Sequence, residues 1–104
     1  MYTSIRRYRV KSPEEFVRRV REGFLPLIRK IHGSLGYHVV NAGNGIWASI
    51  SVFEDRNGVE ESNRLAADWA PKHVGEFLLG PAEITAGELI VQEMVPAGET
   101  PVPA

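Results

Sequence analysis

Two alternating runs around a glycine-rich turn constrain the fold of this chain more than any other feature. Residues 35–42 and 46–54 are rich in β-forming side chains, and Gly43-Asn44-Gly45 between them tolerates the positive φ angles of a tight turn. The sequence therefore predicts a β-hairpin. Neither face of its second strand is suited to water. One face is wholly aliphatic and consists of Ile46, Ala48, Ile50 and Val52. The other face mixes aromatic and hydroxyl side chains and consists of Trp47, Ser49, Ser51 and Phe53.

The segment before the hairpin predicts a strand followed by a helix. Residues 2–10 favour a β-strand, and Ser12-Pro13 follows as a helix start, with Ser12 as N-cap and Glu15 completing a capping box. Proline inside a helix removes a backbone hydrogen bond, so Pro26 predicts a bend. Apolar side chains recur along this helix at steps of three and four: Phe16, Val20, Phe24, Leu27, Ile28 and Ile31.

The segment after the hairpin predicts a second helix and a last strand. Asp55 or Asn57 can cap the helix, and Pro71 predicts a kink in it. Its apolar pattern runs through Val59, Ala66, Ala70, Val74 and Phe77, and the final strand is expected at residues 83–92.

The resulting order, βαββαβ, predicts the fold class and the domain organisation. We expect an α+β, ferredoxin-like domain over residues 1–93, with a four-stranded antiparallel sheet and two helices on one face. A chain of 104 residues has room for one such core. Residues 94–104 form a proline-rich tail, which we expect to be mobile unless a neighbour holds it.

The second sheet face predicts self-association. Two helices cover only one face of a four-stranded sheet, yet several strands carry apolar side chains on both faces. Large apolar patches mark association sites, so we expect a homodimer that pairs the sheet faces of two copies. The alternative is a monomer with an open, partly apolar sheet.

Composition excludes several classes of function. The chain has no cysteine and a net charge of −1, so disulfides, thiol chemistry and a general attraction to nucleic acid or membranes are not expected. We predict a cytoplasmic protein with no nucleic-acid or membrane partner. His32, His38 and His73 form no chelating motif, and no G-x-S-x-G element is present. No metal site and no cofactor are assigned, and hydrolase chemistry has no support.

Polar and small residues occupy the sheet-facing side of the second helix and suggest a site. Asn63 and His73 lie on that side, and Trp69 lies at its edge, four residues before His73 and within reach of it. Two accounts stay open: close packing with ordinary hydrogen bonds, or a cavity for a flat organic ligand that Trp69 would wall. On the strands, Tyr8, His38 and Trp47 are the candidate ligand contacts, although only one of Tyr37 and His38 can face the helices.

Several short segments resemble the dimeric α/β-barrel superfamily, in particular its antibiotic-biosynthesis-monooxygenase-like branch. The resemblance covers about residues 2–93 and includes the following stretches: residues 2–10, Gly23-Phe24-Leu25-Pro26, residues 51–55 leading into Glu60-Glu61-Ser62-Asn63, Ala67-Asp68-Trp69 and Ala86-Gly87-Glu88. The superfamily includes cofactor-independent oxygenases of phenols and quinols, haem-degrading enzymes, isomerases and proteins without known activity.

The resemblance implies a pocket between helices and sheet that uses asparagine, tryptophan and tyrosine or histidine. Asn63, Trp69 and His73 are similar in kind to that set. We therefore predict binding of a small aromatic phenol or quinol and its oxidation by dioxygen. Asn63 would orient a substrate oxygen, His73 would accept the phenolic proton and Trp69 would wall the ring. The alternative is a non-catalytic dimeric ligand-binding or accessory module.

Overall fold

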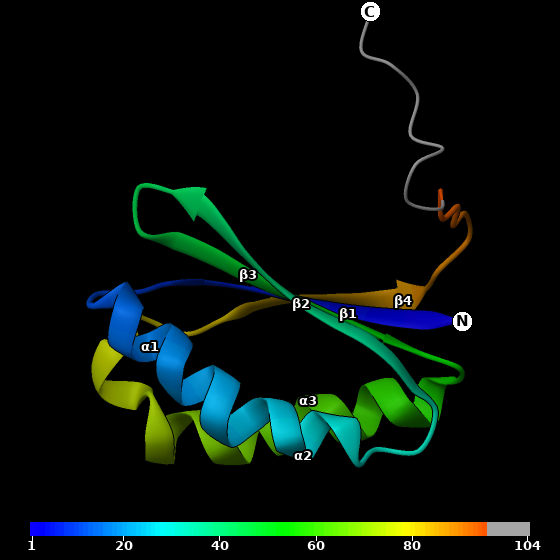
Figure 1. The fold of residues 1–104 in the computed structure, drawn as a ribbon, viewed down its shortest axis with the longest axis horizontal. Helices are drawn as coiled ribbons and strands as arrows, with labels where there is room; N and C mark the ends of the chain where they lie inside the picture. Colours follow the sequence, from blue (N-terminus) through cyan, green and yellow to red (C-terminus); the bar gives the residue numbers. More distant parts are fainter. Residues whose placement is uncertain (96–104) are drawn as a thin grey trace, which may run out of the picture.

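A four-stranded antiparallel sheet carries the helices on one of its faces (Figure 1). The computed structural model describes residues 1–95. Its strands lie in the spatial order β2-β3-β1-β4, and its elements follow the predicted βαββαβ order, so the ferredoxin-like α+β fold is confirmed. The strands are β1 (Tyr2–Arg9), β2 (Ser34–Gly43), β3 (Ile46–Phe53) and β4 (Glu83–Glu88). The helical segments are α1 (Pro13–Arg19), η1 (Val20–Phe24), α2 (Leu25–Arg29), α3 (Arg56–His73) and η2 (Gly75–Phe77).

The start of α1 corrects one prediction. Ser12 precedes Pro13 at the N-cap position, but its φ is 53° and its side chain makes no capping hydrogen bond. Glu15 does not reach back to Ser12 either, because its carboxylate binds the guanidinium groups of Arg18 and Arg19 one turn further on. The predicted capping box is therefore absent. The left-handed backbone at Ser12 turns its side chain away from the N–H groups that a cap would satisfy.

A π-helical turn lies in the middle of the first helix. In η1 the N–H of Leu25 bonds to the carbonyl of Val20, five residues back instead of four. The irregularity predicted from Pro26 thus appears just upstream of the proline. It has a packing consequence for Phe16, Val20, Phe24 and Ile28, which are all buried. A step of four residues overshoots an α-helical turn by about 40°, and the wider π turn counteracts that drift.

The hairpin and the start of α3 follow the prediction. Gly43, Asn44 and Gly45 all have positive φ, at 87°, 55° and 75°. Of the two candidate caps for α3, Asp55 is the one used: its Oδ1 accepts from the N–H of Gly58 at 3.1 Å.

The ends of α3 and β4 differ from the prediction. Pro71 is accommodated in the last turn of α3, the helix ends at His73, and Phe77 lies in η2. The final strand stops at Glu88 instead of residue 92, because Glu88 pairs with Tyr2, the first residue of β1. Beyond Glu88 one more backbone bond forms, from the Leu89 N–H to the Met1 carbonyl at 2.9 Å.

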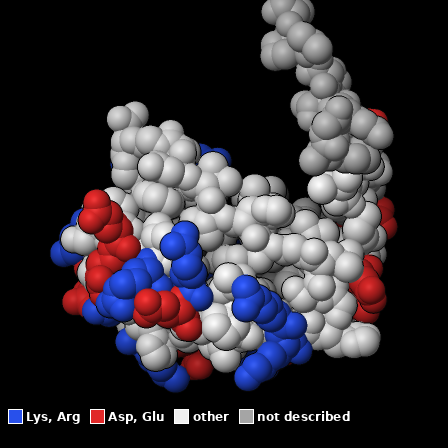
Figure 2. Space-filling view, viewed as in Figure 1, with Lys and Arg blue, Asp and Glu red and all other residues white. Residues whose placement is uncertain are grey.

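The two faces of the sheet differ sharply in burial. Phe53, Ser49 and Ser51 of β3 are buried beneath the helices. We call the opposite side the open face; it carries Ile5, Val40, Ile50 and Val52, and no helix among residues 1–95 packs on it. Ile5 is 37% exposed and Val40 41%. Figure 2 shows charged side chains gathered over the helices, whereas the hairpin side of this view is almost uncharged.

Further apolar residues follow β4. Ile90, Val91 and Met94 are strongly exposed. The tail predicted at residues 94–104 lies outside the described residues except for Met94 and Val95. Within residues 1–95 no helix has the length and apolar character that crossing a bilayer requires.

Candidate functional site

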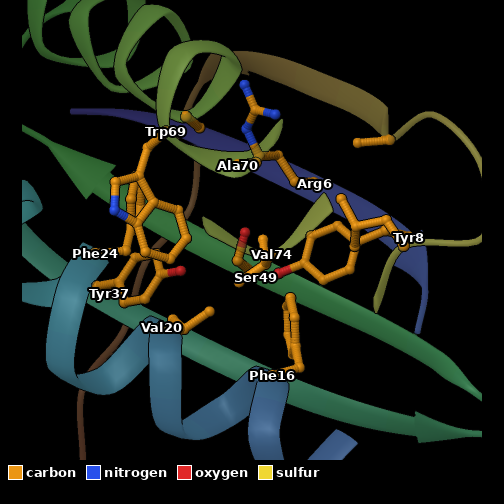
Figure 3. Close-up of a pocket in the computed structure, with 13 residues that line it drawn as sticks. Arg6, Tyr8, Phe16, Val20, Phe24, Tyr37, Ser49, Trp69, Ala70 and Val74 are labelled. Carbon is orange, nitrogen blue, oxygen red and sulfur yellow. The ribbon is translucent and has the colours of Figure 1, made fainter. Parts of the chain in front are cut away.

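A small cavity of about 60 Å³ lies between the helices and the sheet (Figure 3). Each layer of the fold contributes to its lining. The sheet supplies Arg6, Tyr8, Tyr37 and Ser49, and the helices supply Phe16, Val20, Phe24, Ala66, Trp69 and Ala70. Val74 comes from the junction of α3 and η2, and Leu78 and Ala82 from the segment between η2 and β4. The lining is predominantly apolar and contains few polar groups, which is typical of small-molecule sites.

Strand alternation places the sheet residues of this lining. Arg6 and Tyr8 are two residues apart on β1 and therefore share a face, and Arg7 between them points to the open face. On β2 the same rule turns Tyr37 toward the helices and His38 away from them. On β3 Ser49 is buried on the helix side.

Five aromatic rings line the cavity. The Tyr8 ring meets Phe16 edge-on, with ring centroids 5.4 Å apart and an interplanar angle of 63°. Phe24 contacts both Tyr37 and Trp69, at centroid distances of 5.8 Å and 5.2 Å. Tilted and edge-to-face arrangements of this kind are the favourable ones for aromatic pairs. A flat aromatic ligand would meet complementary surfaces here.

The two tyrosine hydroxyls of the cavity are held in their neutral form. Burial raises the pKa of Tyr8 and, more strongly, that of Tyr37. The Ser49 hydroxyl and the positive charge of Arg6 oppose part of that rise. At neutral pH both phenol groups are therefore hydrogen-bond donors and not anions.

Arg6 is the charged residue of the cavity lining, and α3 fixes its position. Its Nη2 donates to the backbone carbonyl of Asn63 at 3.0 Å and to Asn63 Oδ1 at 3.5 Å. Ser4 Oγ donates to the same Oδ1 at 2.7 Å. Burial lowers the pKa of Arg6, and none of the ion pairs among residues 1–95 includes it.

The predicted residues divide between the cavity and other places. Trp69 and Tyr8 line the cavity. Asn63 is bound to Ser4 and Arg6, so it supports a lining residue without lining the cavity itself. Trp47 lies on the helix side of β3 and packs edge-on against Phe16, with centroids 6.3 Å apart, outside the cavity.

Neither histidine of the predicted site lines the cavity. His73 was expected on the buried side of α3, but it is exposed in the last turn of that helix. It does contact Trp69 as predicted: the rings stack at 4.9 Å with an interplanar angle of 22°, but His73 is not among the residues that line the cavity. His38 is exposed on the open face, since Tyr37 takes the position toward the helices.

Solved structures provide the comparison for this arrangement, since no family model matches the sequence and none of the curated proteins is similar to it. A protein of unknown function from Nitrosomonas europaea has a TM-score of 0.69 at 22% identity, over 93% of this chain and 95% of that one. A candidate antibiotic biosynthesis monooxygenase from Bordetella bronchiseptica has a TM-score of 0.70 at 18% identity, over 86% and 97%.

A third similar structure was solved with a ligand bound. It is a monooxygenase of Streptomyces coelicolor in complex with nanaomycin D, with a TM-score of 0.70 at 14% identity and 92% coverage of both chains. This chain has the fold of the antibiotic biosynthesis monooxygenase-like proteins. Identities this low establish the monooxygenase-like fold alone, because one fold hosts many functions.

Within this monooxygenase-like fold, sequence reasoning missed three polar residues of the lining: Arg6, Tyr37 and Ser49. A signal for Arg6 was available. Once Tyr8 is assigned to the helix side of its strand, Arg6 must share that side, and a charged residue on a buried face calls for a reason. Strand alternation also applies to Tyr37 and Ser49, but assigning them to the helix side requires the pairing register between the strands.

Proposed function

We propose that each subunit binds a small phenol in this cavity and oxidises it with dioxygen, without a bound cofactor. One observation carries the proposal: aromatic rings from α1, η1, α3 and the sheet enclose a space whose lining also includes two tyrosine hydroxyls and one arginine. The monooxygenase-like fold, found also in a protein solved with nanaomycin D, supports the same reaction class.

The proposed reaction needs no external reductant. A phenol with a hydrogen on its para carbon loses that hydrogen and its hydroxyl hydrogen and gains one oxygen atom from dioxygen, which gives a para-quinone. The second oxygen atom leaves with both hydrogens as water. The substrate supplies all four electrons. The aromatic wall would orient the ring and exclude water, and the tyrosine hydroxyls would donate hydrogen bonds to the substrate oxygen.

The size of the cavity sets a condition on this function. A cavity of about 150 Å³ in another protein admits benzene, whereas this one measures about 60 Å³. Ligand entry therefore requires the lining to open. The segment between η2 and β4 is the candidate for that movement, since Leu78 and Ala82 line the cavity and Gly80 between them has a φ of 131°.

Site roles change with the observed positions. Trp69 keeps its proposed role as a wall of the site. Asn63 becomes a positioning residue that holds Arg6, instead of a group that touches substrate. His73 is outside the cavity lining, and no histidine, aspartate or glutamate among residues 1–95 lines the cavity, so a phenolic proton would pass to solvent.

Oxygen consumption with a panel of phenols, quinols and anthrones tests the activity. We expect turnover of at least one of them, and a loss of about tenfold or more in Tyr37→Phe if its hydroxyl stabilises charge that develops on the substrate. Tyr2→Phe is the matched control, because it removes the same atom from a tyrosine outside the cavity. Turnover unaffected by Tyr37→Phe would remove that hydroxyl from the mechanism.

A non-catalytic ligand-binding module is the second candidate, and the absence of an acidic or imidazole side chain from the cavity lining favours it. Binding and turnover separate the two functions. Ligand binding to the cavity without oxygen consumption for any member of the panel would establish the module and exclude the oxygenase.

We also propose that two copies pair through their open faces. The support is the apolar open face itself, since monomers rarely expose a contiguous apolar surface of this kind. Ile5→Lys would introduce a charge into the middle of that interface and is expected to halve the mass measured by light scattering. Ile84→Lys is the control: Ile84 is 50% exposed, on the neighbouring strand, but on the helix side of the sheet. A monomeric wild-type protein would contradict this assembly.

A further inference from the structure

We propose that the cavity takes its aromatic ligand as a phenolate, with the guanidinium of Arg6 as the counter-charge. This inference rests on the proposed aromatic site and specifies its substrate class: phenols acidic enough to ionise near neutral pH, bound in preference to neutral rings of the same shape. Four features of the structure support it.

The first feature is the unpaired charge of Arg6. A partly buried cation normally lies beside a carboxylate, because desolvating a charge is costly without a partner. All the ion pairs among residues 1–95 lie on the helical surface, and no carboxylate in that part of the chain pairs with Arg6. Burial lowers the pKa of Arg6, which means that desolvation destabilises its charged form. An anionic ligand beside the guanidinium would offset this desolvation.

The second feature is that Arg6 retains free donors. Its hydrogen bonds to Asn63 use Nη2, and no hydrogen bond within residues 1–95 uses Nε or Nη1. A guanidinium presents its N–H groups in a rigid fork, so fixing one nitrogen fixes the direction of the others. Asn63, itself held by Ser4, thus orients Arg6 while leaving N–H groups for a ligand.

The third feature is the character of the remaining polar groups. Tyr8, Tyr37 and Ser49 offer hydroxyls, and the two tyrosines stay protonated because burial raises their pKa. With Arg6 they make a site of donors whose net charge is positive. Such a site stabilises a negative oxygen more than a neutral hydroxyl.

The fourth feature is the absence of a base from the cavity lining. No side chain of the lining would hold the proton of a neutral phenol. Binding the phenolate places the proton in solvent before the chemistry begins. Ionisation also raises the electron density of the ring, which is the property that a reaction with dioxygen requires.

The experiment uses 4-nitrophenol, whose phenolate is yellow and whose phenol is colourless, so absorbance reports the protonation state of the bound molecule. We expect the bound form to ionise at least about one pH unit below the free form, which equals a tenfold preference for the anion. The neutral methyl ether, 4-nitroanisole, is expected to bind about tenfold more weakly near neutral pH.

Variants assign the effect to Arg6. Arg6→Gln should abolish the shift in ionisation, and Arg6→Lys should retain part of it, because it keeps the charge but not the fork. Arg29→Gln is the matched control, since it removes the same charge from an exposed position on α2. Near-ultraviolet circular dichroism shows whether each variant is folded, and a misfolded Arg6→Gln leaves the decision to Arg6→Lys and the wild-type shift.

The outcomes separate the two proposals. Equal binding of both probes, with no shift in ionisation, would overturn the phenolate assignment and leave the aromatic site standing. Failure of both probes to bind would overturn the aromatic site and the phenolate assignment together. A shift that survives Arg6→Gln would contradict the role of Arg6.

Discussion

Gly23 in η1 lies directly against the indole of Trp69 in α3. A Cβ at this position would come within 2.9 Å of Trp69 Cζ2, closer than two carbon atoms pack. We predict that Gly23→Ala lowers the free energy of unfolding by about 1–2 kcal/mol, because overpacking outweighs the better helix propensity of alanine. Urea denaturation measures this change. Gly75→Ala is the control, since its Cβ would meet only Ala70 O at 3.8 Å.

The buried tyrosines predict a loss of stability in alkali. Burial raises the pKa of Tyr37 and Tyr8, whereas an unfolded tyrosine ionises near pH 10. Above about pH 10 the unfolded state therefore binds fewer protons than the folded state, and the free energy of unfolding falls by up to about 1.4 kcal/mol per pH unit for each tyrosine. Below the unfolded pKa this stability is fully present.

Tyr37→Phe isolates that contribution. The fall between pH 9 and pH 11 should be smaller in Tyr37→Phe than in wild type, while the two proteins should show the same slope between pH 6 and pH 8. Chemical denaturation at each pH gives both slopes. If the free energies of unfolding of the two proteins run parallel from pH 6 to pH 11, Tyr37 has the same pKa in the folded and the unfolded state.

The two helix starts should respond differently to alanine. Asp55→Ala removes the hydrogen bond from the Gly58 N–H to Asp55 Oδ1 and should cost about 1 kcal/mol. Ser12→Ala should cost nothing through capping, because the Ser12 side chain makes no capping bond. Thermal unfolding of the two variants side by side measures the difference, and equal losses would contradict it.

Ser4 and Asn63 should behave as a coupled pair. Asn63→Ala would leave the buried Ser4 hydroxyl without its acceptor and Arg6 with weaker support, at a cost of about 1–3 kcal/mol. In Ser4→Ala/Asn63→Ala the orphaned hydroxyl is gone, so the two losses should not add. A double-mutant cycle gives the coupling energy, and additive losses would show that the hydrogen bond contributes nothing.

The sequence predicted the elements well, because their signals are local. Gly43-Asn44-Gly45 fixes the turn through backbone conformations that few other residues adopt, and the alternation in β3 fixes which residues share a face. Element ends were harder to predict. The end of β4 depends on where β1 begins, which is a property of the pairing and not of the residues after Glu88.

The candidate site could be predicted only in part. Trp69 and Tyr8 were identified from residue type and periodicity, whereas the choice between Tyr37 and His38 needed the register of β2 against β3. His73 was misplaced because the helical wheel treats the last turn of α3 like its middle, although no further turn covers it. Arg6 was missed because charged residues were judged by their number and not by the face that they occupy.

The π-helical turn at Val20–Phe24 makes the length of the first helix critical. The turn holds one residue more than an α-helical turn over nearly the same rotation, so deleting one residue there would let it revert to an ordinary α-helix with Ile28 still facing the core. Inserting one residue would instead rotate α2 by about 100° about its axis and swing Ile28 out of the core. Chains with this fold are therefore expected to lose a residue from this segment more readily than to gain one.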